Sequence, residues 1–294
     1  MKHDIAIWSL GGLTWRKLLR RVWQQFWKDR VLDQSAKLSF YFLLAIFPLL
    51  IFLIALLGLL LQSGPVLREA LHDYLAAVVP TSTSTLIDTT LGEITRGSGA
   101  VKLSAALLFT WWSASHGMLA IIEGLNIAYE VGDSRPWWKK QLLASGLTVG
   151  CLVLIAAVLL LILGGRLSEI LASQLGYSGF IAGLWQVFQW IFLLAFVLMA
   201  FNLLYVYAPN VRHRQWHWLM PGTVVGVALW LLVSFGFQLY LSFFNQYTVT
   251  YGSIGAVIIL MLWLYLSGIA ILVGGEVNSE IERASAHVDE PPAR

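Results

Sequence analysis

Six long apolar stretches constrain this chain more than any other feature of its sequence. A helix crosses the hydrocarbon core of a membrane with about 20 mainly apolar residues, at about 1.5 Å of rise per residue. Six stretches reach that length, and we expect each to form a spanning helix: residues 38–62, 103–122, 142–165, 183–207, 218–242 and 253–275. The sequence therefore predicts an all-α, polytopic membrane protein with six transmembrane helices.

The composition excludes an ordinary soluble domain. Hydrophobic residues make up 58% of the 294 residues and charged residues only 12%, whereas about a quarter of a soluble domain is charged. The chain contains a single cysteine, Cys151, so it can form no internal disulfide and no cysteine-based zinc site. In a membrane protein the distribution of positive charge is more informative than its sum.

Lys and Arg residues are concentrated on one side of the expected spans. They are frequent before the first span, in the second and fourth connections and in the tail, and sparse in the other three connections. By the positive-inside rule, the side richer in Lys and Arg faces the cytoplasm. We therefore expect both termini to be cytoplasmic, which agrees with an even number of spans.

The segment before the first span, "TWRKLLRRVWQQFWKDRVLDQSAK", is typical of a helix that lies in the headgroup layer. Its apolar residues, from Trp15 to Trp27, recur at helical spacing with basic residues elsewhere on the helix. Two readings remain open: an anchor that sets the topology, or specific contact with anionic lipid headgroups. The candidates for headgroup contact, in this segment and in the fourth connection, are Arg16, Lys17, Arg20, Arg21, Arg212 and Arg214.

The remaining segments predict one membrane domain with small additions. Residues 66–96, on the outer side, read as two amphipathic helices broken at Pro80, and we expect a helical hairpin there. Residues 1–280 are expected to form a single domain. Residues 281–294 resemble a disordered cytoplasmic tail because they are polar and rich in small residues.

Four motifs in this order resemble the YihY/BrkB family of bacterial inner-membrane proteins: "AKLSFYFLLAIFPLL", "SASHGMLAIIEGLNIAY", "VYAPNVRHRQWHWLMPG" and "YGSIGAVIILMLWLYLSGIAILVGGEVN". The resemblance covers about residues 15–280. It implies a six-helix protein of the inner membrane, with the hairpin in the periplasm and with virulence or serum resistance linked to some members. It also carries an old label, ribonuclease BN.

The residues give no support to a nuclease. A nuclease needs clustered carboxylates that hold metal ions, or paired His and Lys side chains at a phosphate. The acidic residues here are scattered, and His213 and His217 lie in a short loop without a nearby carboxylate or cysteine. We expect no enzymatic activity, no metal, no cofactor and no nucleic-acid partner.

Polar residues at membrane depth are the functional candidates, because each is costly in hydrocarbon. Ser113, His116, Ala120 and Glu123 share one face of the second span, and Glu276 and Asn278 end the sixth span at the level of Glu123. Alternatively, His116 bonds a backbone carbonyl and Glu276 is the first residue to reach water. We predict an inner mouth of an ion or substrate path formed by His116, Glu123, Asn126, Glu276 and Asn278.

Two classes of function remain. The first is a transporter or flippase for an amphipathic or lipid-linked substrate, favoured by the basic inner side, the polar inner mouth and a kink expected at Pro48. Because the chain has no phosphate-binding Gly-rich loop, such transport would be secondary or passive. The second is a scaffolding protein of the envelope. Membrane lipids are the expected partners, a homo-oligomer is possible, and the sequence does not identify a substrate.

Overall fold

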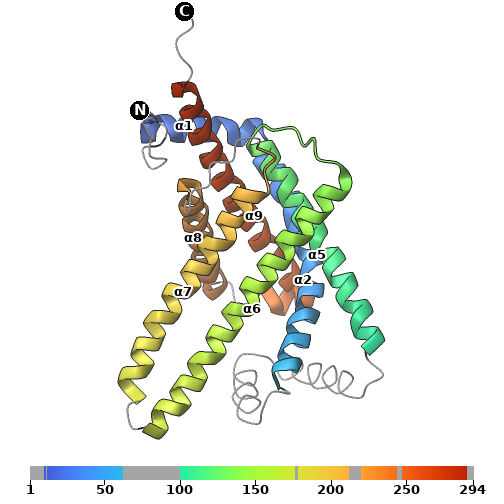
Figure 1. Ribbon diagram of the computed structural model, residues 1–294, viewed down its shortest axis with the longest axis vertical. Helices are drawn as coiled ribbons and strands as arrows, with labels where there is room; N and C mark the ends of the chain where they lie inside the picture. The colour runs from blue at the N-terminus through green and yellow to red at the C-terminus, as the bar shows by residue number, and fades with distance from the viewer. Residues whose placement is uncertain are drawn as a thin grey trace, which may run out of the picture. The chain divides into compact units, whose positions relative to one another are not determined.

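The computed structural model describes residues 10, 12–61, 100–175, 178–211, 220–243 and 247–289. Within these ranges all regular structure is helical, which confirms the predicted fold class (Figure 1). The helices are α1 (Trp15–Lys28), α2 (Val31–Leu61), α5 (Ala100–Ala128), α6 (Trp137–Leu175), α7 (Ser178–Tyr207), α8 (Pro221–Phe243) and α9 (Tyr247–Asp289).

The predicted spans coincide with long helices. Among the described residues, four helical segments are long and apolar enough to cross a membrane: Trp137–Ile162, Gly183–Tyr207, Pro221–Ser242 and Val257–Ser285. The first two predicted spans fall in α2 and α5, which are not among these four segments. The total of six spans therefore stays a prediction. The expected hairpin at residues 66–96, together with Arg212 and Arg214, lies outside the described residues.

The chain divides into two compact units, and the single membrane domain expected over residues 1–280 stays a prediction. Unit 1 contains residues 1–43, 115–147 and 197–294, and unit 2 contains residues 44–114 and 148–196. All the predicted site residues that the structure describes belong to unit 1.

In unit 1, α8 and α9 approach each other closely through glycines. A methyl group placed on Gly222 of α8 would collide with the backbone carbonyl of Gly274 and with the side chain of Asn278. The hydroxyl of Tyr205, on α7, donates a hydrogen bond of 2.8 Å to the carbonyl of Ile271. Small residues at such a crossing allow two helix backbones to pack in membrane proteins. Gly274 and Gly275 of α9 thus lie where neighbouring helices come close.

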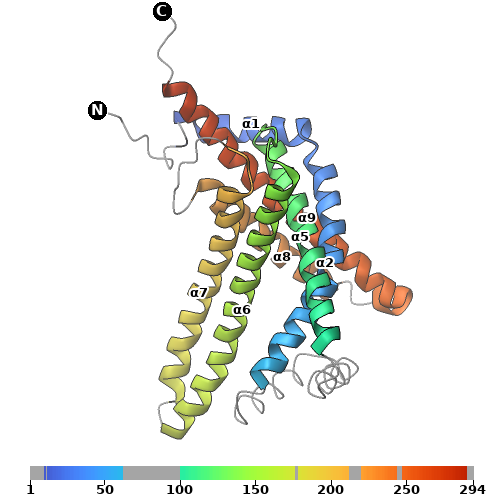
Figure 2. The same cartoon turned by 45° about the vertical axis from the view of Figure 1, so that its right-hand side comes forward.

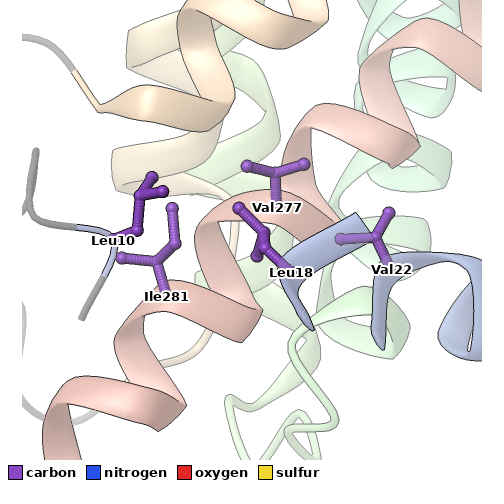
Figure 3. Packing of buried hydrophobic residues seen from close by; sticks show 5 residues of the cluster. All are labelled: Leu10, Leu18, Val22, Val277 and Ile281. Atoms are coloured by element: carbon purple, nitrogen blue, oxygen red, sulfur yellow. The ribbon is translucent and has the colours of Figure 1, made fainter. Parts of the chain in front are cut away.

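The helix α1 also packs on α9. Leu18 and Val22 are buried against Val277 and Ile281, with Leu10 beside them (Figure 3). The predicted amphipathic helix before the first span is therefore confirmed, but only one edge of its apolar face is buried. Leu18 and Val22 contact α9, whereas other large apolar side chains of α1 are exposed: Trp15, Leu19, Trp23 and Trp27.

The end of α9 corrects the sequence interpretation. A disordered segment was expected from residue 281, but α9 continues to Asp289, so the expectation is wrong for residues 281–289. The physical reason is that Val277, Ile281 and Ala284 follow one another at helical spacing and are all buried. The contact with α1 covers the apolar face of this stretch.

Unit 2 has a different surface. Its parts of α6 and α7 run side by side in both views (Figures 1 and 2), and Gly165 of α6 lies against the indole of Trp185 on α7. Trp190 and Ile191 are examples of the large apolar side chains that these helices expose. An exposed apolar surface of this kind is typical of contact with lipid tails.

Candidate functional site

Glu276 is the most deeply buried charged residue among those that the structure describes, with 0% of its surface exposed. It lies on α9 directly after Gly274 and Gly275, where neighbouring helices come closest. A side chain at Gly275 would meet Leu125 of α5, and one at Gly274 would meet Tyr205 of α7. Glu276 is therefore not the first residue of its helix to reach water.

Neither carboxyl oxygen of Glu276 has a hydrogen-bond partner among the described residues. The other buried atoms of which the same is true include Oδ2 of Asp29, the hydroxyl of Tyr129 and Nδ2 of Asn278. Glu276 interacts with Asp29, and Tyr129 with both Glu276 and Asn278. We call these four residues, Asp29, Tyr129, Glu276 and Asn278, the carboxyl cluster.

Three segments distant in sequence position the carboxyl cluster. Asp29 follows α1, and its backbone N–H donates a hydrogen bond to the carbonyl of Gln25, while the N–H of Arg30 donates one to the carbonyl of Trp27. Tyr129 follows the last residue of α5. Asn278 lies on α9, where its Oδ1 accepts a hydrogen bond of 2.7 Å from the backbone N–H of Gly222. Asn278 is thus fixed by its oxygen, while its amide nitrogen has no described partner.

Burial dominates the electrostatics of the carboxyl cluster. It raises the pKa of the Asp29 carboxyl above its ordinary value, although Glu276 and Lys28 act in the opposite direction. Burial likewise raises the pKa of the Tyr129 hydroxyl well above its ordinary value. Both shifts favour the neutral forms.

A group of ion pairs borders the carboxyl cluster. Lys28 bonds to Glu130, which also accepts a hydrogen bond of 2.8 Å from Gln25 and lies 3.1 Å from Arg283. The hydrogen bonds from Lys28 and Gln25 lower the pKa of Glu130. Arg283 also bonds to the side chains of Ser279 and Glu280 and to the carbonyl of Ala128. The guanidinium of Arg283 is therefore engaged with groups other than Glu276.

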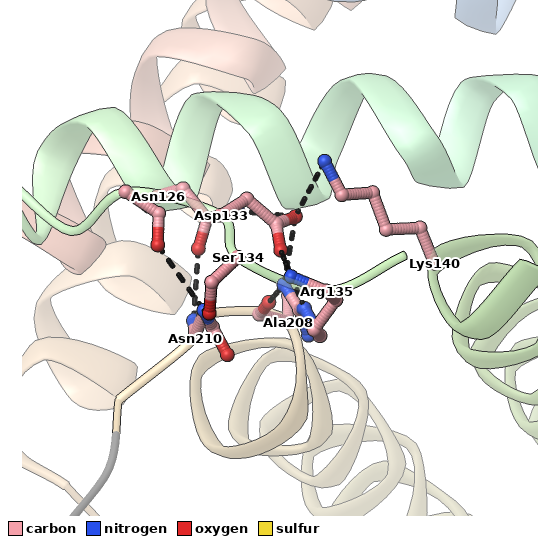
Figure 4. A network of polar contacts seen from close by, with 8 residues as sticks. Asn126, Asp133, Ser134, Arg135, Lys140, Ala208 and Asn210 are labelled. Carbon is pink, nitrogen blue, oxygen red and sulfur yellow. Dashed lines mark hydrogen bonds and ion pairs between the residues drawn. The ribbon is translucent and has the colours of Figure 1, made fainter. Parts of the chain in front are cut away.

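A second polar group, which we call the Asp133 network, is fully paired (Figure 4). It joins the link after α5 to the end of α7 through Asn126, Asp133, Ser134, Arg135, Lys140, Ala208 and Asn210. Arg135 donates bonds of 2.9 and 3.2 Å to the Asp133 carboxylate and one of 2.9 Å to the carbonyl of Ala208. Asn126 bonds to Asp133 through its Nδ2 and accepts from the backbone N–H of Asn210.

Asp133 differs from Asp29 in its titration. Burial alone would raise the pKa of Asp133, but hydrogen bonds from the side chain and backbone of Arg135 outweigh it and lower the pKa. The Asp133 network thus holds its carboxylate in the charged form.

The structure separates the residues of the predicted inner mouth. Glu276 and Asn278 come together in the carboxyl cluster, whereas Asn126 belongs to the Asp133 network. Glu123 is exposed and pairs with Lys37 of α2 at 2.6 Å, and His116 is half-buried on α5. These five residues therefore have different surroundings within one unit.

Sequence reasoning missed Asp29 and Tyr129. Asp29 follows an amphipathic helix in "WKDR", a position that usually faces water, and Tyr129 ends the motif "GLNIAY". No spacing relates either residue to Glu276, because the contact joins three separate segments. The available signal was only that Tyr129 closes a motif of the family resemblance.

The candidate headgroup contacts lie along α1. Arg16, Lys17 and Arg20 are exposed, and Arg21 pairs with Glu280 of α9 at 3.6 Å. Arg21 therefore links the surface of α1 to the helix that carries Glu276. In the part of the chain that the structure describes, no group of three His, Cys, Asp or Glu side chains could hold a metal ion.

Comparisons with known proteins place these features in a family. The family described as Virulence factor BrkB matches residues 22–294. The protein named "Putative ribonuclease-like protein YfkH" of Bacillus subtilis (strain 168) is 34% identical over 261 residues, covering 88% of this chain and 93% of the relative.

A second group of relatives is longer. UPF0761 membrane protein Smlt0865 of Stenotrophomonas maltophilia (strain K279a) is 25% identical over 281 residues, and the match covers 89% of this chain but 60% of the relative. The chain thus spans about 60% of the length of that relative. No solved structure matches. With its long apolar helices, the chain is a multi-pass membrane protein that belongs to the Virulence factor BrkB family.

Proposed function

We propose that this protein is a secondary or passive transporter, or a flippase, for an amphipathic or lipid-linked substrate in the bacterial inner membrane. The observation that carries the proposal is Glu276, a fully buried carboxyl group that receives no hydrogen bond from the described residues, on a helical segment long and apolar enough to cross a membrane. Buried polar groups in native proteins are nearly always paired. An unpaired ionisable group inside a membrane protein is typical of an ion or substrate pathway.

The surface of α1 supports an amphipathic substrate. Its exposed Trp residues and its basic side chains are of the kinds that lie at the level of lipid headgroups. Arg16, Lys17 and Arg20 would contact anionic headgroups there, and Arg21 would connect that surface to α9 through Glu280. We extend the same role to Arg212 and Arg214, which lie outside the described residues.

The test uses the full chain in liposomes that contain phosphatidylglycerol labelled with the NBD fluorophore. Dithionite reduces only the label in the outer leaflet, unless the protein moves labelled lipid between leaflets. We expect dithionite to reduce most of the label in liposomes with wild-type protein. With Glu276→Gln, we expect it to reduce only the label in the outer leaflet. The matched control is Asp33→Asn, an exposed carboxylate on α2, which should behave as wild type.

Wild-type protein that leaves the inner-leaflet label intact would overturn lipid translocation and favour the scaffolding alternative. Translocation that Glu276→Gln does not reduce would remove Glu276 from the pathway.

The orientation is part of the proposal, with both termini in the cytoplasm as the distribution of Lys and Arg indicates. Gly132 lies exposed in the link between α5 and α6, with no heavy atom near the position of an added side chain. In a Cys151→Ala background, Gly132→Cys should resist an impermeant maleimide in intact cells and react in inverted vesicles. Labelling in intact cells would reverse the orientation.

A further inference from the structure

The carboxyl cluster places two acidic side chains side by side within unit 1. Asp29 is fixed by the tight turn between α1 and α2, in which Arg30 adopts a positive φ of 50°. Glu276 is fixed by the close packing of α9 on its neighbours. The two carboxyl groups interact with each other, and no other described residue forms a hydrogen bond with an oxygen of Glu276.

The surrounding charges do not neutralise this pair. From α9, Glu280 adds a negative charge and Arg283 a positive one. Arg283 is bonded to Glu130, Glu280, Ser279 and the Ala128 carbonyl. From α1, Lys28 bonds to Glu130, and from α7 the Tyr205 hydroxyl donates to the Ile271 carbonyl. On α8, the residue that meets this region is Gly222, which has no charge.

A buried carboxyl group and a half-buried one beside it cannot both be ionised at low cost, because like charges repel and burial disfavours the charged form of each. Such a pair shares a proton and titrates as a unit. The hydroxyl of Tyr129 and the amide of Asn278 can each donate a hydrogen bond, and both lack a described partner. They are available to a carboxylate once the shared proton has left.

We propose that Glu276 and Asp29 form a binding site for one exchangeable proton, with Tyr129 and Asn278 as hydrogen-bond donors to the deprotonated pair. On loading, a proton from water forms an O–H bond with a carboxylate oxygen of the pair. On release, that O–H bond breaks and the proton returns to water by way of Asp29, the more exposed member. The proton site does not depend on transport by the protein. Only the role of the proton as the ion that drives transport rests on the proposed function.

The experiment is an infrared titration of the full-length protein in lipid nanodiscs. A protonated carboxyl group has a carbonyl band that a carboxylate lacks. We expect wild type to show this band at neutral pH, where exposed Asp and Glu residues are ionised. In a Glu282→Gln background, which removes another half-buried carboxyl group of α9, Glu276→Gln should abolish the band, and the matched control Asp33→Asn should retain it.

Two further variants give opposite shifts in the pH at which the band disappears. Asp29→Asn removes a neighbouring negative charge, so the proton should leave at a lower pH, by about one unit or more. Tyr129→Phe removes a donor to the carboxylate, so the proton should leave at a higher pH. Circular dichroism confirms that each variant is folded.

Absence of the band in wild type at neutral pH, or its persistence in Glu276→Gln, would overturn the proton site. An unchanged midpoint in Asp29→Asn would overturn the pair. The titration is repeated with sodium in place of potassium in the buffer. Loss of the band in sodium at constant pH would identify a metal-cation site and overturn the proton assignment. Because the readout requires no substrate, the band can be present when lipid translocation fails, so the two proposals fail separately.

Discussion

The Asp133 network and the carboxyl cluster are both groups of polar side chains, but they differ in whether those side chains have hydrogen-bond partners. Both lie in unit 1, and both join side chains from elements far apart in sequence. In the Asp133 network, Arg135 meets Asp133 with two side-chain bonds. In the carboxyl cluster, each of the four residues has a buried atom to which no described residue is hydrogen-bonded by geometry. Paired polar groups specify a fold, whereas unpaired ones cost stability and are typical of binding sites.

Breaking the Asp133 network should produce the largest effect. Arg135→Ala leaves the partly buried Asp133 carboxylate and the Ala208 carbonyl without the guanidinium, so the free energy of unfolding should fall by about 3 kcal/mol. Unfolding in detergent measures this loss. The neighbouring Lys139→Ala, in which an exposed lysine is removed, should be nearly silent. Equal losses in the two variants would show that the network does not stabilise the fold.

A pair of glycine variants tests whether the carboxyl cluster is unpaired merely because its surroundings are loosely packed. Gly222→Ala should destabilise by about 1–3 kcal/mol, because the added methyl group collides with Gly274 and Asn278. On the same helix, a methyl group added to Gly236 would meet no described neighbouring atom within 4 Å, so Gly236→Ala should stabilise by about 0.5–1 kcal/mol. The midpoint of thermal unfolding, measured for both variants, tests these two expectations. Tolerance of Gly222→Ala would mean that this region can expand.

The two aspartates should respond to pH with opposite signs, in the smallest of these effects. The folded pKa of Asp133 is lowered from 3.8, so its contribution to stability is present above pH 3.8 and is lost as the pH falls through the lowered value. The folded pKa of Asp29 is raised from 3.8, so stability falls as the pH rises from 3.8 through the raised value.

Asparagine substitutions measure this difference. At pH 7, Asp133→Asn should lower the midpoint of thermal unfolding and Asp29→Asn should raise it, and the gain from Asp29→Asn should disappear below about pH 3.8. The exposed Asp33→Asn provides the baseline. Changes of the same sign at pH 7 would remove the distinction between the two regions.

The helices could be predicted from the sequence because the length of an apolar stretch and its lack of charge are local properties. The end of α9 was misjudged because the apolar stretch stops near Gly275, although Val277 and Ile281 continue the helical spacing. Those two residues pack on α1, and no local pattern identifies such a distant partner.

The same limit applies to the candidate site. Spacing placed Glu123 and Asn126 near the end of one helix and Glu276 near the end of another, but it could not identify the neighbours of each. Lys37 of α2 pairs with Glu123, and Asp133 accepts a hydrogen bond from Asn126. What distinguishes Glu276 is the absence of a described partner, a property that only the packed structure reveals.

The contact between α1 and α9 has a consequence for biosynthesis. Val22 and Val277 belong to the same apolar cluster, yet they come from the first and last described helices of the chain. A ribosome that adds about 5–20 residues per second needs on the order of 10–50 s to make the intervening chain. During that time α9 does not yet cover the apolar residues of α1 that pack on it, so the packing of α1 is completed only when α9 has been made.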